Sequence, residues 1–319
     1  NILSKSGKKC HLGGNIGKPL LPEIEYISED DFAVVELSSF QLMTMTKSPD
    51  IAVITNIAPN HLDVHKGMEE YIEAKKNVFK FQSKENLLVL NAKNDITSKL
   101  DSEAKGEVVF FGGEDSTVSL RGNFIYFKED PVLDINDILI PGKHNVENYM
   151  AAIGAVYAIA DKDSIYDVAK NFGGVEHRIE FVKEIDGVRF YNDSIASSPT
   201  RARAGLYAFD KKVILIAGGY DKKIPFDDFG YDIKERVKRL YLIGDTAPKI
   251  KEAVLKACDG QRLIPIITQY QTLDSVVKEA YMSAQAGDVV LLSPACASFD
   301  SFKNFEERGK KFKELVRKL

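Results

Sequence analysis

The chain has 319 residues, enough for about two domains with substantial hydrophobic cores. Its 43 basic and 47 acidic residues give a net charge of −4, and its longest apolar runs are only about five residues, so neither nucleic-acid binding nor a membrane span is expected. Three cysteines without paired spacing and the lack of a secretory signal predict a soluble cytoplasmic protein.

Short β-rich apolar runs alternate with helical stretches, which predicts an α/β fold with largely parallel sheets. The first residues resemble the end of a helix that leads into residues 8–14. The sequence of residues 117–127 predicts a hairpin that turns at Gly122 and Asn123. The other elements expected in this half are strands at 32–37, 51–56, 86–91 and 107–111 and helices near 68–82 and 144–161.

A second unit is expected from about residue 177, with the boundary near Gly173 and Gly174. We expect it to open with a hairpin across Asp186 and Gly187, and its apolar run 213–217 is typical of a doubly wound sheet. We therefore predict a mostly parallel central domain at 1–176 and a Rossmann-like C-terminal domain at 177–319. The strands expected in the second domain are 212–217, 239–243, 264–268 and 288–292.

Two polar residues follow consecutive predicted strands of the first domain. Glu36 ends a strand, where a carboxylate can reach Mg²⁺ held over nucleotide phosphates. The alternative is a helix capped by Ser38 or Ser39, with Glu36 in a turn. His61 follows the next strand and is expected at the same sheet edge as Glu36, as a metal ligand or as a solvated loop histidine.

The helix after His61 places a lysine inside an apolar stripe. Met68, Ile72, Lys75 and Phe79 share one face of a 3.6-residue period, whereas Lys76 points elsewhere. Lys75 is either desolvated, with a lowered pKa and a nucleophilic amine that can form a carbamate, or it snorkels to solvent. The residues alone favour snorkelling.

Further polar groups stand at the starts of helices and after strands. The amides of Asn145 and Asn148 can bind a purine edge or cap their helix. The pair His177-Arg178 offers a bidentate clamp for a γ-phosphate or an interdomain ion pair. Asp193 and Lys222 follow strands of the second domain, where they can bind a ribose, metal, carboxylate or phosphate, or form ordinary turns.

Residues 293–309 read Ser-Pro-Ala-Cys-Ala-Ser-Phe-Asp-Ser-Phe-Lys-Asn-Phe-Glu-Glu-Arg-Gly. They follow a buried strand and lead into the final amphipathic helix, 305–319. Such a turn opens onto the crevice where ligands bind in open α/β sheets, and a helix N-terminus attracts anions. The alternative is a capped final helix with Phe299, Phe302 and Phe305 in the core.

The amino-acid sequence of residues 293–309 resembles that of the Mur ligase family. The order of the other motifs, over essentially the whole chain, resembles that family too. The resemblance is strongest to the members that add D-glutamate to UDP-N-acetylmuramoyl-L-alanine. It implies that residues 1–176 are a partial ATPase-type central domain that uses ATP and two Mg²⁺ sites. ATP would phosphorylate the L-alanyl carboxylate, and the D-glutamate amine would attack the resulting acyl phosphate.

The resemblance also implies a role for each motif residue. Lys75 falls where the family has its carbamylated lysine, which overturns the preference for snorkelling. The implied metal and catalytic residues are Glu36, His61 and Lys75, with Arg178 also catalytic. The implied nucleotide contacts are Asn145, Asn148, His177, Arg178 and Asp193. The implied substrate contacts are Asn15, Ser38 and Gln41 for the muramoyl substrate and Ser197, Lys222, Ser298 and Phe305 for D-glutamate.

One residue departs from the family pattern: Ile195 stands where many members have lysine. Either another residue, with Arg201 as the candidate, replaces that charge, or D-glutamate binds differently. The family's UDP-binding domain and phosphate loop are expected before residue 1, so we expect the chain as given to be inactive in ligation. We separately expect a monomer. Folylpolyglutamate synthase, another Mur ligase and a non-catalytic binding module are the alternatives. The sequence of residues 293–309 disfavours folylpolyglutamate synthase and another Mur ligase.

Overall fold

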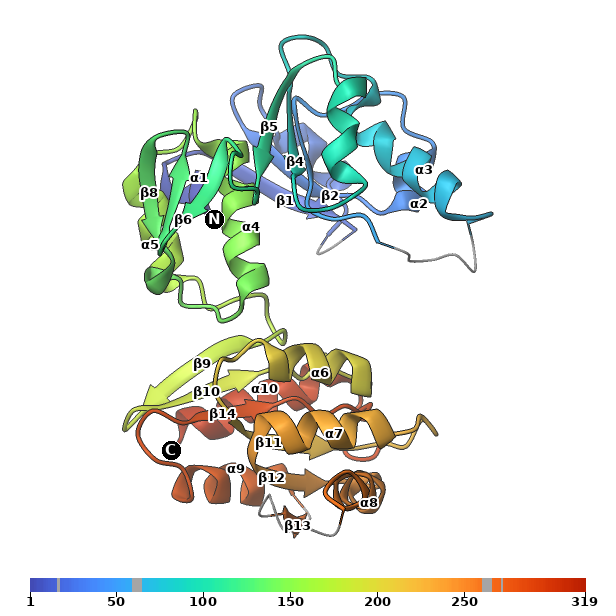
Figure 1. The fold of residues 1–319 in the computed structure, drawn as a ribbon, viewed down its shortest axis with the longest axis vertical. Helices are drawn as coiled ribbons and strands as arrows, with labels where there is room; N and C mark the ends of the chain where they lie inside the picture. The colour runs from blue at the N-terminus through green and yellow to red at the C-terminus, as the bar shows by residue number, and fades with distance from the viewer. Residues whose placement is uncertain (16–17, 59–64, 260–265, 271) are drawn as a thin grey trace. The chain divides into compact units, whose positions relative to one another are not determined.

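The computed structural model describes residues 1–15, 18–58, 65–259, 266–270 and 272–319. It divides into two compact units. Unit 1 comprises Asn1–Ile138 and His144–Asn171, and unit 2 comprises Leu139–Lys143 and Phe172–Leu319. Each unit is a mixed α/β structure dominated by parallel strand pairs, which confirms the predicted fold class (Figure 1). Within the described residues, no helix is both long and apolar enough to cross a membrane.

The larger sheet of unit 1 has the strand order β3-β4-β5-β6-β7-β8. The pairs from β3 to β6 are parallel, whereas β6, β7 and β8 form an antiparallel meander that includes the predicted hairpin at Gly122 and Asn123. The strands are β3 (Ile51–Ile54), β4 (Leu87–Asn91), β5 (Glu107–Phe111), β6 (Val118–Arg121), β7 (Phe124–Phe127) and β8 (Asp130–Asp134).

A separate two-stranded sheet pairs β1 (Cys10–Gly14) with β2 (Phe32–Glu36) in parallel. Among the described strands β2 pairs with β1 over its whole length, and β3 pairs with β4. The expectation that Glu36 and His61 follow neighbouring strands of one sheet is therefore incorrect. His61 itself lies outside the described residues.

Two helices cover the opposite faces of the β3–β5 part of the sheet. On α3 (Met68–Lys80), Tyr71 and Phe79 join the core that contains Leu88 and Leu90 of β4. On α4 (Lys143–Val156), a Cβ atom at Gly154 would lie 3.1 Å from Val89 Cγ1, so α4 lies very close to the sheet. The other elements of unit 1 are α1 (Ile2–Lys5), α2 (Ser39–Met43), α5 (Lys162–Asn171) and the 3₁₀ segments Leu21–Tyr26, Thr97–Glu103 and Ile135–Asp137.

The predicted helix 144–161 is shorter in the structure. It ends at Val156, and α5 begins as a new helix at Lys162. Asp161 separates the two, because its carboxylate accepts hydrogen bonds from the backbone nitrogen of Ser164 at 2.7 Å and from the Ser164 hydroxyl at 2.9 Å. This is the capping pattern that starts a helix.

Unit 2 has the strand order β13-β12-β11-β14-β10-β9. Among its described strands only β9 and β10, the predicted hairpin, pair antiparallel. One face of the sheet is covered by α6, α7 and α8 and the other by α9 and α10 (Figure 1). The strands are β9 (Glu180–Ile185), β10 (Val188–Asn192), β11 (Val213–Gly218), β12 (Val237–Ile243), β13 (Ile266–Tyr270) and β14 (Val289–Leu292). The helices are α6 (Pro199–Tyr207), α7 (Asp227–Arg236), α8 (Ala247–Ala257), α9 (Leu273–Met282) and α10 (Phe305–Arg317).

This connectivity places a switch point between β11 and β14. The two strands are neighbours in the sheet, but the helices that follow them, α7 and α10, lie on opposite faces. Ligands of doubly wound sheets bind in the crevice outside the carboxyl ends of such a strand pair. The loops after β11 and β14 are therefore the candidate binding loops of unit 2.

Candidate functional site

In unit 1 the predicted substrate residue Asn15 lies against the predicted metal ligand Glu36. The Asn15 backbone nitrogen donates to the Glu36 carbonyl at 2.7 Å, and Asn15 Nδ2 donates to Glu36 Oε1 at 3.2 Å. Gly14 makes this approach possible, because it has φ +104° and a Cβ there would lie 2.2 Å from the Glu36 carbonyl oxygen. The Glu36 carboxylate remains exposed to solvent and accessible to a cation.

Ser38 caps helix α2. The Ser38 hydroxyl accepts from the Gln41 backbone nitrogen at 3.3 Å, and the Ser38 backbone nitrogen donates to Gln41 Oε1 at 2.9 Å. Glu36 is the last residue of β2, and a helix capped by Ser38 begins just beyond it. The Mg²⁺ role of Glu36 stays a prediction. The amide oxygen of Gln41 is used within the cap.

Lys75 lies half-buried on the apolar side of α3, as its place in the stripe predicted. Burial lowers the pKa of Lys75, and the negative charge of Glu36 opposes that shift. Within the described part of the chain the Lys75 ammonium makes no ion pair, and it lies 5.8 Å from the centre of the Tyr71 ring. The charge of Glu36, at the end of β2, thus acts on the Lys75 amine of α3.

Only some of the predicted metal ligands lie among the described residues. In these ranges no three His, Cys, Asp or Glu side chains form a metal-binding group. The predicted set instead combines Glu36 with His61, which lies outside the described residues, and a carbamate on Lys75. The exposed Glu36 oxygens and the half-buried Lys75 amine fit an oxygen-rich Mg²⁺ site of that composition.

A cavity of about 370 Å³ lies at the carboxyl ends of β3, β4 and β5, beside the start of α4. It contains Asn148, whose Nδ2 donates to Asn145 Oδ1 at 3.3 Å, so the two predicted nucleotide residues lie together. The position of this cavity, at strand ends and a helix N-terminus, suits a phosphorylated ligand. Its lining consists of Thr55, Asn56, Asn91, Lys93, Asn94, Phe111, His144, Glu147 and Asn148.

Two asparagines of this cavity, Asn91 and Asn94, were not predicted from the sequence. Asn91 Nδ2 donates to the Thr55 carbonyl at 3.0 Å, and Asn94 Nδ2 donates to the Ile57 carbonyl at 3.1 Å. They hold the segment after β3 against the segment after β4. The signal that could have found them is the polar run directly after the buried strand β4.

In unit 2 the two candidate loops at the switch point are joined through their backbones. Tyr220 N donates to the Ala297 carbonyl at 3.0 Å. Gly219, with φ +148°, fits only without a side chain, because its Cβ would lie 2.4 Å from the Ala297 oxygen. This junction brings together the loops that carry Lys222, which is exposed, and Ser298, which is only 2% exposed.

Two other residues predicted to bind D-glutamate lie at the N-terminal ends of α6 and α10. Ser197 is half-buried just before α6, and its backbone nitrogen donates to the Ile195 carbonyl at 2.8 Å. Phe305 opens α10, where its ring meets His177 edge-on at 5.9 Å and its carbonyl accepts from the Ser194 hydroxyl at 2.8 Å. Asn304 caps α10 by accepting from the Glu307 nitrogen at 2.8 Å.

Arg308 organises this region, although the sequence reasoning gave it no role. It is 1% exposed, and its guanidinium donates to Ser194 Oγ and to the carbonyls of Ser194, Cys296 and Ala297 at 2.9–3.1 Å. Burial lowers the Arg308 pKa to about 10, so the group stays charged at neutral pH. It ties the loops after β10 and β14 to α10.

The other predicted nucleotide residues lie in unit 2. His177 is buried, with Nδ1 2.9 Å from Asn192 Nδ2, and burial lowers its pKa. Arg178 is exposed. Asp193 is 4% exposed and accepts from the Ser293 hydroxyl at 2.7 Å, and burial raises its pKa to about 7. Of these three, Arg178 alone presents its side chain freely to solvent.

Ile195 occupies the position where many family members have lysine. Ile195 is half-buried, whereas Arg201 on α6 is exposed. The positive charges of Arg178 and Arg201 both act to lower the Asp193 pKa against the larger effect of burial. Arg201 thus supplies a cation near the turn that carries Ile195.

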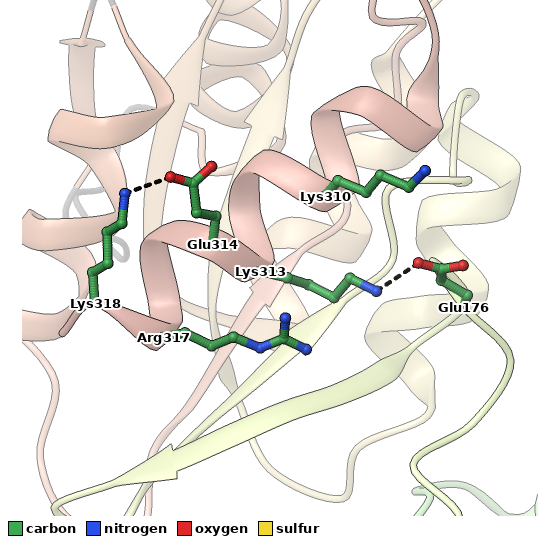
Figure 2. Close-up of a pocket in the computed structure, with 6 residues that line it drawn as sticks. All are labelled: Glu176, Lys310, Lys313, Glu314, Arg317 and Lys318. Carbon is green, nitrogen blue, oxygen red and sulfur yellow. Dashed lines mark hydrogen bonds and ion pairs between the residues drawn. The ribbon is translucent and has the colours of Figure 1, made fainter.

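A second cavity, of about 350 Å³, lies in unit 2 but contains none of the predicted site residues. Figure 2 shows its lining, in which Lys313 reaches across to Glu176. Lys313 pairs with Glu176 at 2.7 Å and with Glu180 at 2.9 Å, so it fastens α10 to the start of β9. The lining comprises Glu176, Lys310, Lys313, Glu314, Arg317 and Lys318.

Protein-family models match most of the chain. Residues 9–156 match the family model of the Mur ligase middle domain, and residues 177–296 match that of the Mur ligase glutamate ligase domain. The chain belongs to the Mur ligase family. This confirms the resemblance carried by the motifs.

Curated relatives match the whole chain, and two of them serve as examples. It is 56% identical over 328 residues to UDP-N-acetylmuramoylalanine–D-glutamate ligase of Acetivibrio thermocellus and 52% identical over 323 residues to that of Clostridium perfringens. Each alignment covers 100% of this chain and 70% of the relative.

Solved structures share the fold at low identity. MurF from Acinetobacter baumannii matches with a TM-score of 0.63 at 14% identity, over 98% of this chain and 78% of that one. MurC from Thermotoga maritima matches with a TM-score of 0.61 at 17% identity, over 99% and 77%. A folylpolyglutamate synthase from Mycobacterium tuberculosis matches with a TM-score of 0.55 at 17% identity, over 89% and 69%.

Proposed function

We propose that the chain is the central and C-terminal part of an ATP-dependent ligase that adds D-glutamate to UDP-N-acetylmuramoyl-L-alanine in peptidoglycan precursor synthesis. The observation that carries the proposal is the 56% identity, over the whole chain, to a relative named for this reaction. The loops at the switch point of unit 2 and the polar cavity of unit 1 supply two places for ligands.

The reaction requires transfer of the γ-phosphoryl group of ATP to the L-alanyl carboxylate. The D-glutamate amine then attacks the acyl carbon, the amide bond forms, and phosphate leaves. In such a transfer the protein mainly positions the reactants and stabilises charge. Asn145 and Asn148 would bind the adenine, Arg178 would approach the γ-phosphate, and Lys222 with Ser298 would hold the D-glutamate carboxylates.

Mg²⁺ would neutralise phosphate charge during the transfer. We propose two Mg²⁺ sites, with Glu36 as a ligand and with His61 and a carbamate on Lys75 at the second site. Asn15, Ser38 and Gln41 would lie on the side of the muramoyl substrate. His177 and Asp193 would complete the nucleotide contacts, and Ser197 and Phe305 those to D-glutamate. The lowered pKa of Lys75 supports the carbamate, because a neutral amine is the form that reacts with carbon dioxide.

We further propose a monomeric cytoplasmic enzyme. All three cysteines are free, as expected in a reducing compartment where ATP is abundant. Folylpolyglutamate synthase shares the fold at 17% identity, which supports a common architecture but no common substrate.

The test is a ligation assay on a chimaera in which the N-terminal segment of the Acetivibrio thermocellus relative precedes this chain. Phosphate release from ATP should require both UDP-N-acetylmuramoyl-L-alanine and D-glutamate, and L-glutamate should not replace D-glutamate. Release that instead depends on a folate and L-glutamate would favour the synthase alternative. Binding of D-glutamate without any phosphate release would favour a binding module.

A further inference from the structure

His65 is a buried imidazole that none of the predicted roles uses. It is 4% exposed, with Nε2 2.9 Å from Ser39 Oγ and Nδ1 3.5 Å from Glu70 Oε2. Its ring stacks on Phe40, with centroids 5.1 Å apart and planes inclined by 7°, and meets Tyr71 edge-on at 5.3 Å. The imidazole is therefore held between α2 and the first turn of α3.

A serine, an imidazole and a carboxylate in this order resemble a nucleophilic triad. However, Ser39 is only 2% exposed and is the first residue of α2, so no substrate carbonyl can approach its oxygen. A neutral imidazole protonated on Nδ1 would accept from the Ser39 hydroxyl and face the Glu70 carboxylate. The arrangement is thus a link between two helices.

The two helices carry the candidate metal-site groups. Ser39 follows Glu36 by three residues, and Tyr71, which the His65 ring touches, precedes Lys75 by one helical turn. The Tyr71 ring in turn lies 5.8 Å from the Lys75 ammonium. Continuous contacts therefore run from the turn after β2, through His65, to Lys75.

A second tie joins the other ends of the same helices. Asn77 Nδ2 on α3 donates to the Leu42 carbonyl on α2 at 2.9 Å. Asn77 fixes the C-terminal part of α2. The bond between Ser39 and His65 fixes the N-terminal part of α2, which lies nearer to Glu36. Two separated ties also prevent α2 from pivoting on α3.

We propose that His65 is a positioning residue that holds the turn after Glu36 against the helix bearing Lys75, and so sets the geometry of the metal site. The inference rests on the proposed function, because that function assigns Mg²⁺ to Glu36 and Lys75. Groups that orient metal ligands from outside the coordination shell typically change metal affinity by about 10–100-fold when they are removed.

The experiment titrates the chain with Mn²⁺ in bicarbonate buffer and follows free Mn²⁺ by electron paramagnetic resonance. His65→Phe keeps the ring contacts but removes both nitrogens, and we expect about tenfold weaker Mn²⁺ binding. His65→Gln places an amide near the position of Nε2 and keeps a bond to Ser39, so we expect binding within about threefold of the unchanged chain. Rescue by glutamine but not by phenylalanine identifies the polar link, not the packing, as the cause.

Further variants make the result decisive. Ser39→Ala should weaken binding as His65→Phe does, and the double variant should lose no more than either single one, because both remove the same link. Glu69→Gln, an exposed neighbour on the same turn of α3, should bind like the unchanged chain. If His65→Phe fails to fold, as judged by circular dichroism, Ser39→Ala carries the same expectation with a smaller change of volume.

Two outcomes overturn the proposal and are distinguishable. If Glu36→Gln and Lys75→Ala weaken Mn²⁺ binding but His65→Phe and Ser39→Ala do not, the metal site stands and the positioning role is wrong. If Glu36→Gln and Lys75→Ala leave Mn²⁺ binding unchanged, the assigned metal site is wrong and its positioning by His65 falls with it.

Discussion

Lys75 and Lys76 are neighbours on α3 with different environments. Lys76 forms ion pairs with Glu73 at 2.8 Å and Glu103 at 2.6 Å, and these raise its pKa. Lys75 has no such partner within the described residues, and burial lowers its pKa. The helical period alone separated the two side chains, because residues one position apart lie about 100° apart around a helix.

This contrast provides a paired test of the carbamate. With ¹³C-bicarbonate and Mg²⁺ at neutral pH, we expect one protein-bound carbamate signal in the ¹³C NMR spectrum. Lys75→Ala should abolish the signal, whereas Lys76→Ala should leave it, because the Lys76 amine stays protonated in its ion pairs. A signal that survives in Lys75→Ala would place the carbamate elsewhere.

Asp193 predicts a specific dependence of stability on pH. Its carboxyl has a pKa of about 7 in the fold against 3.8 in the unfolded chain, because it is buried. The folded state therefore binds more protons between pH 4 and 7, and this group's contribution to stability is lost as the pH rises through that range. Asp193→Asn removes the titration, so its unfolding free energy relative to the unchanged chain should rise by about 2–4 kcal/mol from pH 4 to pH 8.

Urea denaturation at a series of pH values measures this difference. Asp228→Asn, an exposed change on α7, serves as the control and should track the unchanged chain. A constant difference between Asp193→Asn and the unchanged chain would show that Asp193 is ionised throughout.

At the scale of elements, Arg308 connects the loops after β10 and β14 to α10 through four hydrogen bonds. Its acceptors are carbonyl and hydroxyl oxygens, so removing the guanidinium leaves several buried oxygens without a donor. Each such group costs about 1–3 kcal/mol. Arg308→Met should therefore destabilise unit 2 by roughly 3 kcal/mol or more, and Arg308→Lys by less, because one ammonium can replace some of the bonds.

The matched control is Arg317→Met on the exposed side of the same helix, which should change stability by less than about 0.5 kcal/mol. The unfolding free energy of unit 2 in urea gives the comparison. Equal stabilities for the two methionine variants would mean that the loops hold their positions without Arg308.

The elements themselves were largely predictable because their signals are local. The hairpins at Gly122 and at Asp186-Gly187 follow from turn residues between β-rich runs, and the strand at 107–111 was placed with its observed bounds. The break between α4 and α5 was missed because the capping signal of Asp161 was outweighed by the continuing helical pattern.

Contacts between distant residues were not predictable from a single sequence. Arg308 and Ser194 are 114 residues apart, and Asn94 and Ile57 are 37 apart. Likewise, strand spacing did not reveal that β2 pairs with β1 instead of joining the sheet of β3. His65 was not predicted because its partner Ser39 lies 26 residues earlier in the chain, on α2.

At the scale of the whole molecule, the chain comprises two compact units, each with its own buried core. In unit 2, helices cover both faces of the doubly wound sheet. A backbone hydrogen bond joins the candidate binding loops after β11 and β14 within the unit. A domain with a complete core and short connections can fold independently. Residues 172–319 should therefore fold alone and retain the proposed D-glutamate site.

NMR titration of residues 172–319 tests both expectations. D-Glutamate should shift the backbone amides of Lys222 and Ser298 with roughly millimolar affinity, since the rest of the site is absent. L-Glutamate should shift them less, because its amine and carboxylates cannot meet the same groups together. Lys222→Ala should abolish the D-glutamate response, whereas Lys223→Ala, an exposed change one residue along, should preserve it. Equal shifts for the two enantiomers, or a full response in Lys222→Ala, would remove the switch-point loops as the acceptor site.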